Sequence, residues 1–124
     1  MSDMKGIIEK SVGEHNDLLK TLMTDRELLE LAAKAAGYRV EEHQPTGGFI
    51  AKQGFLQWRA WDPLFDDGDA LRLAVQLCMN IEVTESDVYA CSHGNFSEPA
   101  KPDRQAATRR AIVRAAAEVG KSMP

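Results

Sequence analysis

Residues 103–120, DRQAATRRAIVRAAAEVG, carry the helical pattern around which the rest of the chain must be arranged. Asp103 is placed to cap the first turn, and Gly120 is placed to end the helix. Small apolar residues recur on one face, at Ala107, Ala111, Ala115 and Val119, with Ile112 and Ala116 beside them. This face predicts a helix that packs against a sheet, with Arg109, Arg110 and Arg114 on its other side.

The same segment concentrates positive charge. Residues 101–124 carry six Lys or Arg side chains and two acidic ones, whereas the whole chain has a formal charge of −4. A basic helix indicates either a nucleic-acid contact or ion pairs within the protein. The candidate basic patch consists of Arg104, Arg109, Arg110 and Arg114. Domains that bind duplex nucleic acid are usually basic as a whole, so the acidic balance argues against nucleic acid.

Length and composition indicate one globular core. The chain has 124 residues, of which 44% are hydrophobic and 27% are charged, both near the averages for soluble domains. No apolar run approaches the roughly 18 residues of a membrane span, and the N-terminus lacks a signal-peptide pattern. Cys78 and Cys91 are the two cysteines, and we expect both thiols to be buried in a reducing cytosol.

A second helix is predicted over residues 25–36. Thr24 and Glu27 have the spacing of a capping box, and Gly37 can adopt the positive φ at which such helices stop. The following stretches, 38–44 and 48–61, alternate and are separated by the turn sequence PTGG, which predicts a meander of two or three strands with a turn or bulge at Gly54.

Residues 61–75, WDPLFDDGDALRLAV, crowd four aspartates around one glycine. Pro63 excludes a helix before Asp66, so Asp66 is predicted as the cap of a helix and Asp69 as a carboxylate that reaches back to free N–H groups. A calcium-binding loop requires acidic residues at alternating positions, which are not found. A looser divalent-cation site at Asp62, Asp66, Asp67 and Asp69 is the alternative.

Two short strands are predicted next, at 81–83 and 88–91, and residues 94–102 are predicted as a loop because they hold two prolines. The order of elements indicates an α+β fold. We expect a central antiparallel or mixed sheet of four to five strands flanked by helices, in the manner of an α/β/α sandwich, with an extra N-terminal helix.

Catalytic and metal motifs are not found in the sequence. Cys78, Cys91, His43 and His93 do not have the paired spacing of zinc ligands, and Cys91 with His93 is a weak nucleophile pair. PTGG lacks the lysine and the helix of a phosphate-binding loop. We therefore predict no catalytic residue, no metal and no cofactor.

Three aromatic residues are candidates for a partner contact: Trp58, Trp61 and Phe65. Trp58 and Trp61 face opposite sides if the strand continues between them, so one can be core and the other exposed. Core packing is the favoured interpretation of these aromatic residues, and a binding hot spot is the alternative.

Residues 1–22 form a segment distinct from the domain at 23–124. Ile8, Val12 and Leu19 fall in a heptad pattern, which places a narrow apolar seam on one helix face. Such a seam can lie against the protein's own body, against a second copy of the chain or against another protein. A homo-oligomer through this segment is one of these arrangements, and a frayed tail is the remaining one.

Three blocks resemble a known family: MTDRELLELAAKAAGY (23–38), WDPLFDDGDALRLAVQL (61–77) and AATRRAIVRAAAEVGK (106–121). Together they look like the phage ABA sandwich domain family of small phage and prophage proteins. The resemblance covers residues 23–121 and implies helices that flank a central sheet. It brings no assigned function, no catalytic residue and no cofactor, and residues 1–22 lie outside it.

These observations predict a phage-encoded accessory protein of the host cytoplasm that binds a host or phage protein without catalysis. Small acidic phage proteins often act by occlusion, so inhibition of a host function or defence system is one form of this activity. The alternative is a nucleic-acid-associated regulator that uses the basic C-terminal helix. An enzyme with an aspartate-lined site comes third.

Overall fold

The structure is a computed structural model that describes residues 23–43, 48–53 and 57–124. These residues form helices and strands in the order α3 (Asp25–Ala36), β1 (Arg39–Glu42), β2 (Phe49–Lys52), β3 (Arg59–Ala60), α4 (Asp67–Gln76), β4 (Asn80–Val83), β5 (Asp87–Cys91), β6 (Asn95–Pro99) and α5 (Arg104–Ser122). The predicted α+β class is confirmed. The predicted N-terminal helix, the turn at PTGG before Gly48 and the bulge at Gly54 lie outside the described residues.

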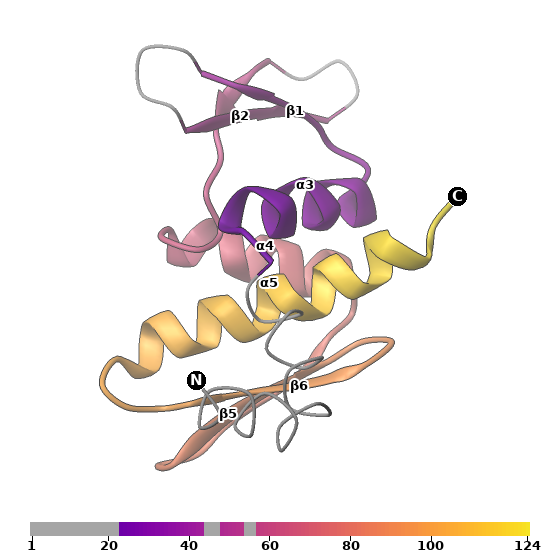
Figure 1. The fold of residues 1–124 in the computed structure, drawn as a ribbon. Coiled ribbons are helices and arrows are strands. Elements are labelled where there is room, and N and C mark those ends of the chain that lie inside the picture. Colours follow the sequence, from indigo (N-terminus) through magenta and orange to yellow (C-terminus); the bar gives the residue numbers. More distant parts are fainter. Residues whose placement is uncertain (1–22, 44–47, 54–56) are drawn as a thin grey trace, which may run out of the picture.

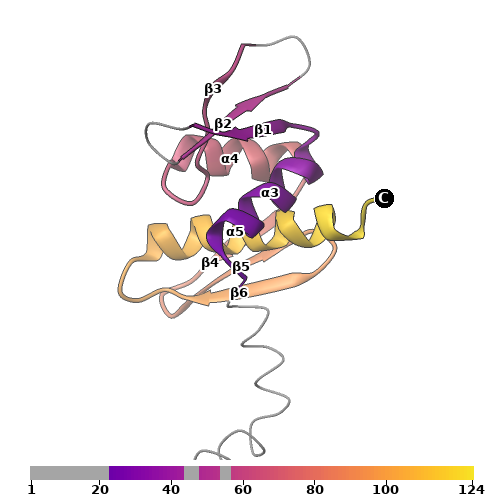
Figure 2. The same ribbon diagram turned by 45° about the horizontal axis from the view of Figure 1, so that its top comes forward.

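The strands form two separate antiparallel sheets, ordered β1-β2-β3 and β4-β5-β6, and not one sheet of four to five strands. Both ribbon views place the helices between the sheets: β1-β2-β3 lies beside α3 and α4, and β4-β5-β6 lies on the far side of α5 (Figures 1 and 2). The expected central sheet is therefore replaced by a central layer of helices.

The composition of α5 explains why helices, and not a sheet, form the central layer. Nine of its residues are buried, among them the consecutive residues Ala111, Ile112 and Val113, which point in three different directions around the helix axis. A helix that is apolar on several sides must be covered on several sides. It packs against α3 and α4 on one side and against β5 and β6 on the other.

The prediction that Gly120 ends the last helix is wrong, because α5 continues to Ser122. Gly120 lies where α3 and α5 approach each other closely: a Cβ atom built on Gly120 would stand 2.0 Å from the carbonyl oxygen of Leu31. The glycine is therefore needed for the close approach of two helices.

The capping residues predicted at the other helix ends are confirmed. The Thr24 hydroxyl accepts from the Glu27 N–H at 3.1 Å, and the Glu27 carboxylate accepts from the Thr24 N–H, which completes the capping box. Gly37 follows α3 with φ 77°. Asp103 accepts from the Ala106 N–H at 3.0 Å at the start of α5.

The predicted strands at 81–83 and 88–91 and the predicted meander are confirmed, but the predicted loop at 94–102 is not. Residues Asn95–Pro99 form β6, which pairs along its length with β5. A proline is tolerated at the end of an edge strand because one side of such a strand needs no backbone donor. The Cys78 side chain is exposed and Cys91 is half-buried, contrary to expectation, because Cys78 follows the end of α4.

Candidate functional site

The four arginines of the predicted basic patch are engaged within the protein. The guanidinium of Arg104 donates to the carbonyl oxygens of Thr84 and Glu85, at 3.3 and 3.1 Å. Arg109 donates to the carbonyl oxygen of Leu64 at 2.8 Å and to the carboxylate of Asp67 at 2.6 Å. Arg104 thus connects α5 to the turn between β4 and β5, and Arg109 connects it to the segment that leads into α4.

The other two arginines bind acidic side chains on opposite sides of α5. Arg110 pairs with Asp25 at 3.0 Å, and Arg114 pairs with Glu98 and lies 5.0 Å from the ring centre of Phe96. Only 20% of the Arg114 side chain is exposed, so its charge is largely used within the fold. These arginines thus form ion pairs with the elements packed around α5, and they do not form a free basic surface.

The acidic cluster is built as a helix start. Asp66 caps α4 by accepting from the Asp69 N–H at 2.8 Å. Asp69, only 6% exposed, accepts from the Asp62 N–H at 2.9 Å and from Arg72 at 2.7 Å. The prediction that Asp69 reaches back to a free N–H group is confirmed. Within the described ranges, no three His, Cys, Asp or Glu side chains are arranged to hold a metal ion.

The Asp62 carboxyl has a pKa above its ordinary value. Partial burial raises the pKa of Asp62, while hydrogen bonds from the N–H groups of Leu64 and Phe65 oppose the rise, and the nearby charges of Asp69 and Asp25 add to it. The ionised form of Asp62 is therefore less favourable in the folded protein than in the unfolded chain.

The three aromatic candidates take different positions. Trp61 is 2% exposed and packs edge-to-face on Tyr38, with ring centres 5.8 Å apart, so it is core and not an exposed hot spot. Trp58 is half-buried, and Phe65 is 77% exposed. Ile8, Val12 and Leu19 lie outside the described residues.

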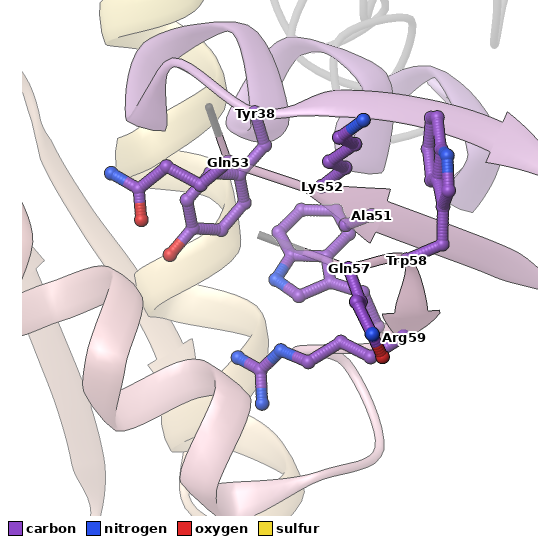
Figure 3. Close-up of a pocket in the computed structure, with 8 residues that line it drawn as sticks. Tyr38, Ala51, Lys52, Gln53, Gln57, Trp58 and Arg59 are labelled. Atoms are coloured by element: carbon purple, nitrogen blue, oxygen red, sulfur yellow. The ribbon is translucent and has the colours of Figure 1, made fainter. Parts of the chain in front are cut away.

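Trp58 and Trp61 nevertheless meet at one cleft of about 450 Å³ beside the β1-β2-β3 sheet. Its walls are Tyr38, Ala51, Lys52, Gln53, Gln57, Trp58, Arg59 and Trp61. In Figure 3, Trp58 stands opposite Tyr38 and Gln53, and Arg59 extends along the lower edge. The sequence identified the two tryptophans but not the polar residues that accompany them.

A second surface was missed entirely by reasoning from the sequence. Leu71, Ile81 and Ile112 line an apolar hollow of about 320 Å³ between α4, β4 and α5, together with Asp67, Ala70, Gln105, Thr108 and Arg109. We call this hollow the β4 groove. Leu71 is 61% exposed and Ile81 is 37% exposed. The available signal was that Leu71 and Val75 lie one turn apart on α4, away from its buried face.

Comparisons with protein-family models, with curated proteins and with solved structures give no match to this chain. Among the described residues, no helix combines the length and the apolar character needed to cross a bilayer.

Proposed function

We propose that this chain is a phage-encoded accessory protein that acts by binding another protein through the β4 groove. The phage origin is supported by the resemblance of three sequence blocks to small phage proteins. The binding mode is supported by one structural observation, namely that the layer of helices does not cover strand β4.

The registers of the lower sheet show this gap. Ile81 pairs with Ala90 and Val83 pairs with Val88, so the side chains of each pair lie on the same face. Val88 and Ala90 are fully buried because α5 packs over β5, whereas Ile81 and Val83 are 37% and 51% exposed. On this face of the sheet, the side chains of β5 are therefore buried and those of β4 are exposed to solvent.

The surroundings of the groove favour a macromolecular partner over catalysis. Its exposed lining is mainly aliphatic, and the side chains of Asp67 and Arg109 at its border are paired with each other at 2.6 Å. Apolar surface flanked by satisfied polar groups is typical of protein contacts. An apolar helix of a partner would lie over β4 beside α5 and complete the helical layer, which is the helix-in-groove mode of recognition.

Among the described residues, β4 is also an edge strand, because only β5 pairs with it in the sheet. Inhibition of a host function by occlusion is the form of this activity that we propose. The engaged arginines of α5 weigh against the nucleic-acid alternative.

The test compares groove variants in partner capture. The tagged full-length protein is incubated with lysate of a bacterial host, captured proteins are identified by mass spectrometry, and the affinity of each is measured with purified components. We expect Leu71→Lys and Ile81→Lys each to weaken binding at least tenfold, because each places a charge in an apolar contact. Both positions are exposed, so stability should change by less than about 0.5 kcal/mol.

Met123→Lys is the matched control, because it places the same charge at an exposed apolar residue outside the groove. It should leave binding unchanged. If the groove variants and the control capture and bind every partner equally, the groove is not the binding surface. A dimer of the wild-type chain that both groove variants abolish would identify the partner as a second copy.

A further inference from the structure

The face of the β4-β5-β6 sheet that points away from α5 takes no part in the proposed protein contact. Side chains alternate between the two faces of a strand, and cross-strand neighbours share a face. Val88 and Ala90 of β5 are buried under α5, so Tyr89 and Cys91 lie on the opposite face. Both ribbon views show the described helices on one side of this sheet (Figures 1 and 2). We call the other side the outer face.

The strand registers place two rows of side chains next to each other on the outer face. Asn80 and Asn95 flank Cys91 in one row, and Glu82 lies beside Tyr89 in the next. A hollow of about 440 Å³ on this face is lined by Asn80, Ile81, Glu82, Tyr89, Cys91 and Asn95. The Ile81 side chain points to the other face, toward the β4 groove, so Ile81 borders the hollow with its main chain.

The charges of the outer face exclude an anionic ligand. β4, β5 and β6 contain no Lys or Arg, whereas Glu82 and Asp87 both point to this face. A phosphate or carboxylate ligand would meet like charge here and would find no cation to pair with. The ligand that fits is therefore neutral or positively charged.

The free hydrogen-bonding groups favour a neutral ligand over a cation. Among the described residues, the side chains of Asn80, Glu82 and Asn95 have no hydrogen-bond or ion-pair partner. Each carboxamide offers donors and an acceptor, and the carboxylate only accepts. A cation only donates and would leave the amide N–H groups unused, whereas the hydroxyl groups of a sugar donate and accept.

Tyr89 adds an aromatic surface at the central strand of the sheet. The face of such a ring carries partial negative charge, and the C–H groups on one side of a pyranose ring carry partial positive charge. Rows two residues apart lie about 7 Å from each other, and the two outer strands lie about 10 Å apart. These dimensions are the scale of one sugar ring with its hydroxyl groups. The volume of the hollow is also within the range of small-molecule sites, roughly 300–1,000 Å³.

We propose that the outer face binds a neutral saccharide, with one sugar ring against Tyr89 and its hydroxyl groups on Asn80, Asn95 and Glu82. The same chemistry is offered by a free sugar and by one residue of a glycan chain. The site lies on the opposite face of the sheet from the β4 groove, so it is independent of the proposed protein contact.

NMR titration of the isotope-labelled full-length protein tests this proposal. The probes are glucose, mannose, galactose and N-acetylglucosamine, each as the monosaccharide and as an unbranched oligosaccharide. A sugar phosphate is the anionic comparator, and choline is the cationic one. We expect at least one neutral sugar to give saturable shifts of the amides of residues 80–82, 89–91 and 95. Both comparators should bind about tenfold more weakly or not at all.

Variants assign the roles of the side chains. Tyr89→Val, Asn80→Ala and Asn95→Ala should each weaken binding about fivefold through loss of one contact, and Tyr89→Phe should retain most of the affinity because the ring remains. Glu82→Ala should have a similar effect. Its matched control is Glu41→Ala, which removes an exposed carboxylate from the edge strand of the other sheet and should change nothing.

The amide spectrum of each variant reports whether it is folded. Asn80 and Glu82 are exposed, so their variants test the site even if Tyr89→Val does not fold. Leu71→Lys in the β4 groove should bind sugars as the wild type does, which separates this site from the proposed protein contact.

The two sources of the ligand are distinguished by affinity. Tighter binding of an oligosaccharide than of its monosaccharide assigns the outer face to a glycan chain, and equal affinity assigns it to a free sugar. The proposal is wrong if no neutral sugar shifts these amides at millimolar concentration, or if the folded variants bind as the wild type does. It is also wrong if choline binds more tightly than every sugar and Glu82→Gln abolishes that binding.

Discussion

Replacement of Gly120 by alanine tests the packing at the centre of the fold. An alanine inside a helix normally stabilises it by about 1 kcal/mol relative to glycine, because the unfolded chain has less freedom to lose. Here the added Cβ atom would stand 2.0 Å from the Leu31 carbonyl oxygen, whereas real Cβ contacts are essentially never closer than 3.0 Å. The obstructing atom is backbone, so no side-chain rotation relieves the clash.

The two helices must therefore separate by at least the missing 1.0 Å, the difference between 3.0 and 2.0 Å. Overpacking of this kind costs about 3 kcal/mol at the upper end of its usual range. After the propensity gain of about 1 kcal/mol, we expect Gly120→Ala to lower the free energy of unfolding by about 2 kcal/mol. For a domain of this size, the melting temperature should fall by about 8 °C.

Urea unfolding followed by circular dichroism measures this change, and Gly68→Ala is the matched control. Gly68 is also helical, but its Cβ atom would meet only the ends of the Asp66 and Arg72 side chains, at 3.1 and 3.2 Å. The Arg72 side chain can move aside, and the contact with the Asp66 cap needs only a small shift, so Gly68→Ala should change the free energy of unfolding by no more than about 1 kcal/mol in either direction. A Gly120→Ala protein as stable as the wild type would refute the close contact between α3 and α5.

Three further predictions concern charge and domain limits. Asp66→Ala should cost about 0.5–2 kcal/mol in urea unfolding through loss of the α4 cap, Asp66→Asn should cost little, and millimolar Ca²⁺ or Mg²⁺ should leave the melting temperature of the wild type unchanged; a metal-dependent rise would contradict the capping role. Folding raises the pKa of Asp62, so the ionised carboxylate destabilises the fold above the ordinary aspartate pKa of 3.8. Asp62→Asn should therefore raise the melting temperature at neutral pH, and this gain should vanish as the pH falls below 3.8. An equal gain at neutral pH and below pH 3.8 would contradict this assignment. Deletion of residues 1–22 should leave a folded protein, since Thr24 and Glu27 still cap α3, and sedimentation should show the loss of any dimer of the full chain; an unchanged dimer would exclude the N-terminal seam as its cause.

Features that depend on a few neighbouring residues were predictable from the sequence. The capping box at Thr24, the left-handed residue Gly37 and the Asp66 and Asp103 caps each follow from a side chain that bonds a backbone group within three residues, or from a glycine at a helix end. The meander and the β4–β5 pair follow from alternation and short turns. Such signals are local, so no knowledge of the tertiary fold is required.

Features that depend on distant contacts were not predictable. The role of Gly120 inside α5 depends on the close approach of Leu31 from another helix, and the position of Pro99 in β6 is tolerated because β6 lies at a sheet edge. The arrangement of layers follows from burial on several sides of α5, which one apolar stripe did not reveal. The same limit applies to the candidate sites, because the exposure of Ile81 and the contact between Tyr38 and Trp61 are tertiary facts.

The measurement closest to the central claim is site-specific photocrosslinking in host cells. A photoreactive phenylalanine analogue is placed at Ile81 in the β4 groove or at Glu41, an exposed residue of the other sheet. If the groove is the contact surface, irradiation should join the chain to a defined protein from position 81 and not from position 41, and Leu71→Lys should abolish that product. Crosslinking of the same protein from position 41, or no product from position 81, would contradict the account.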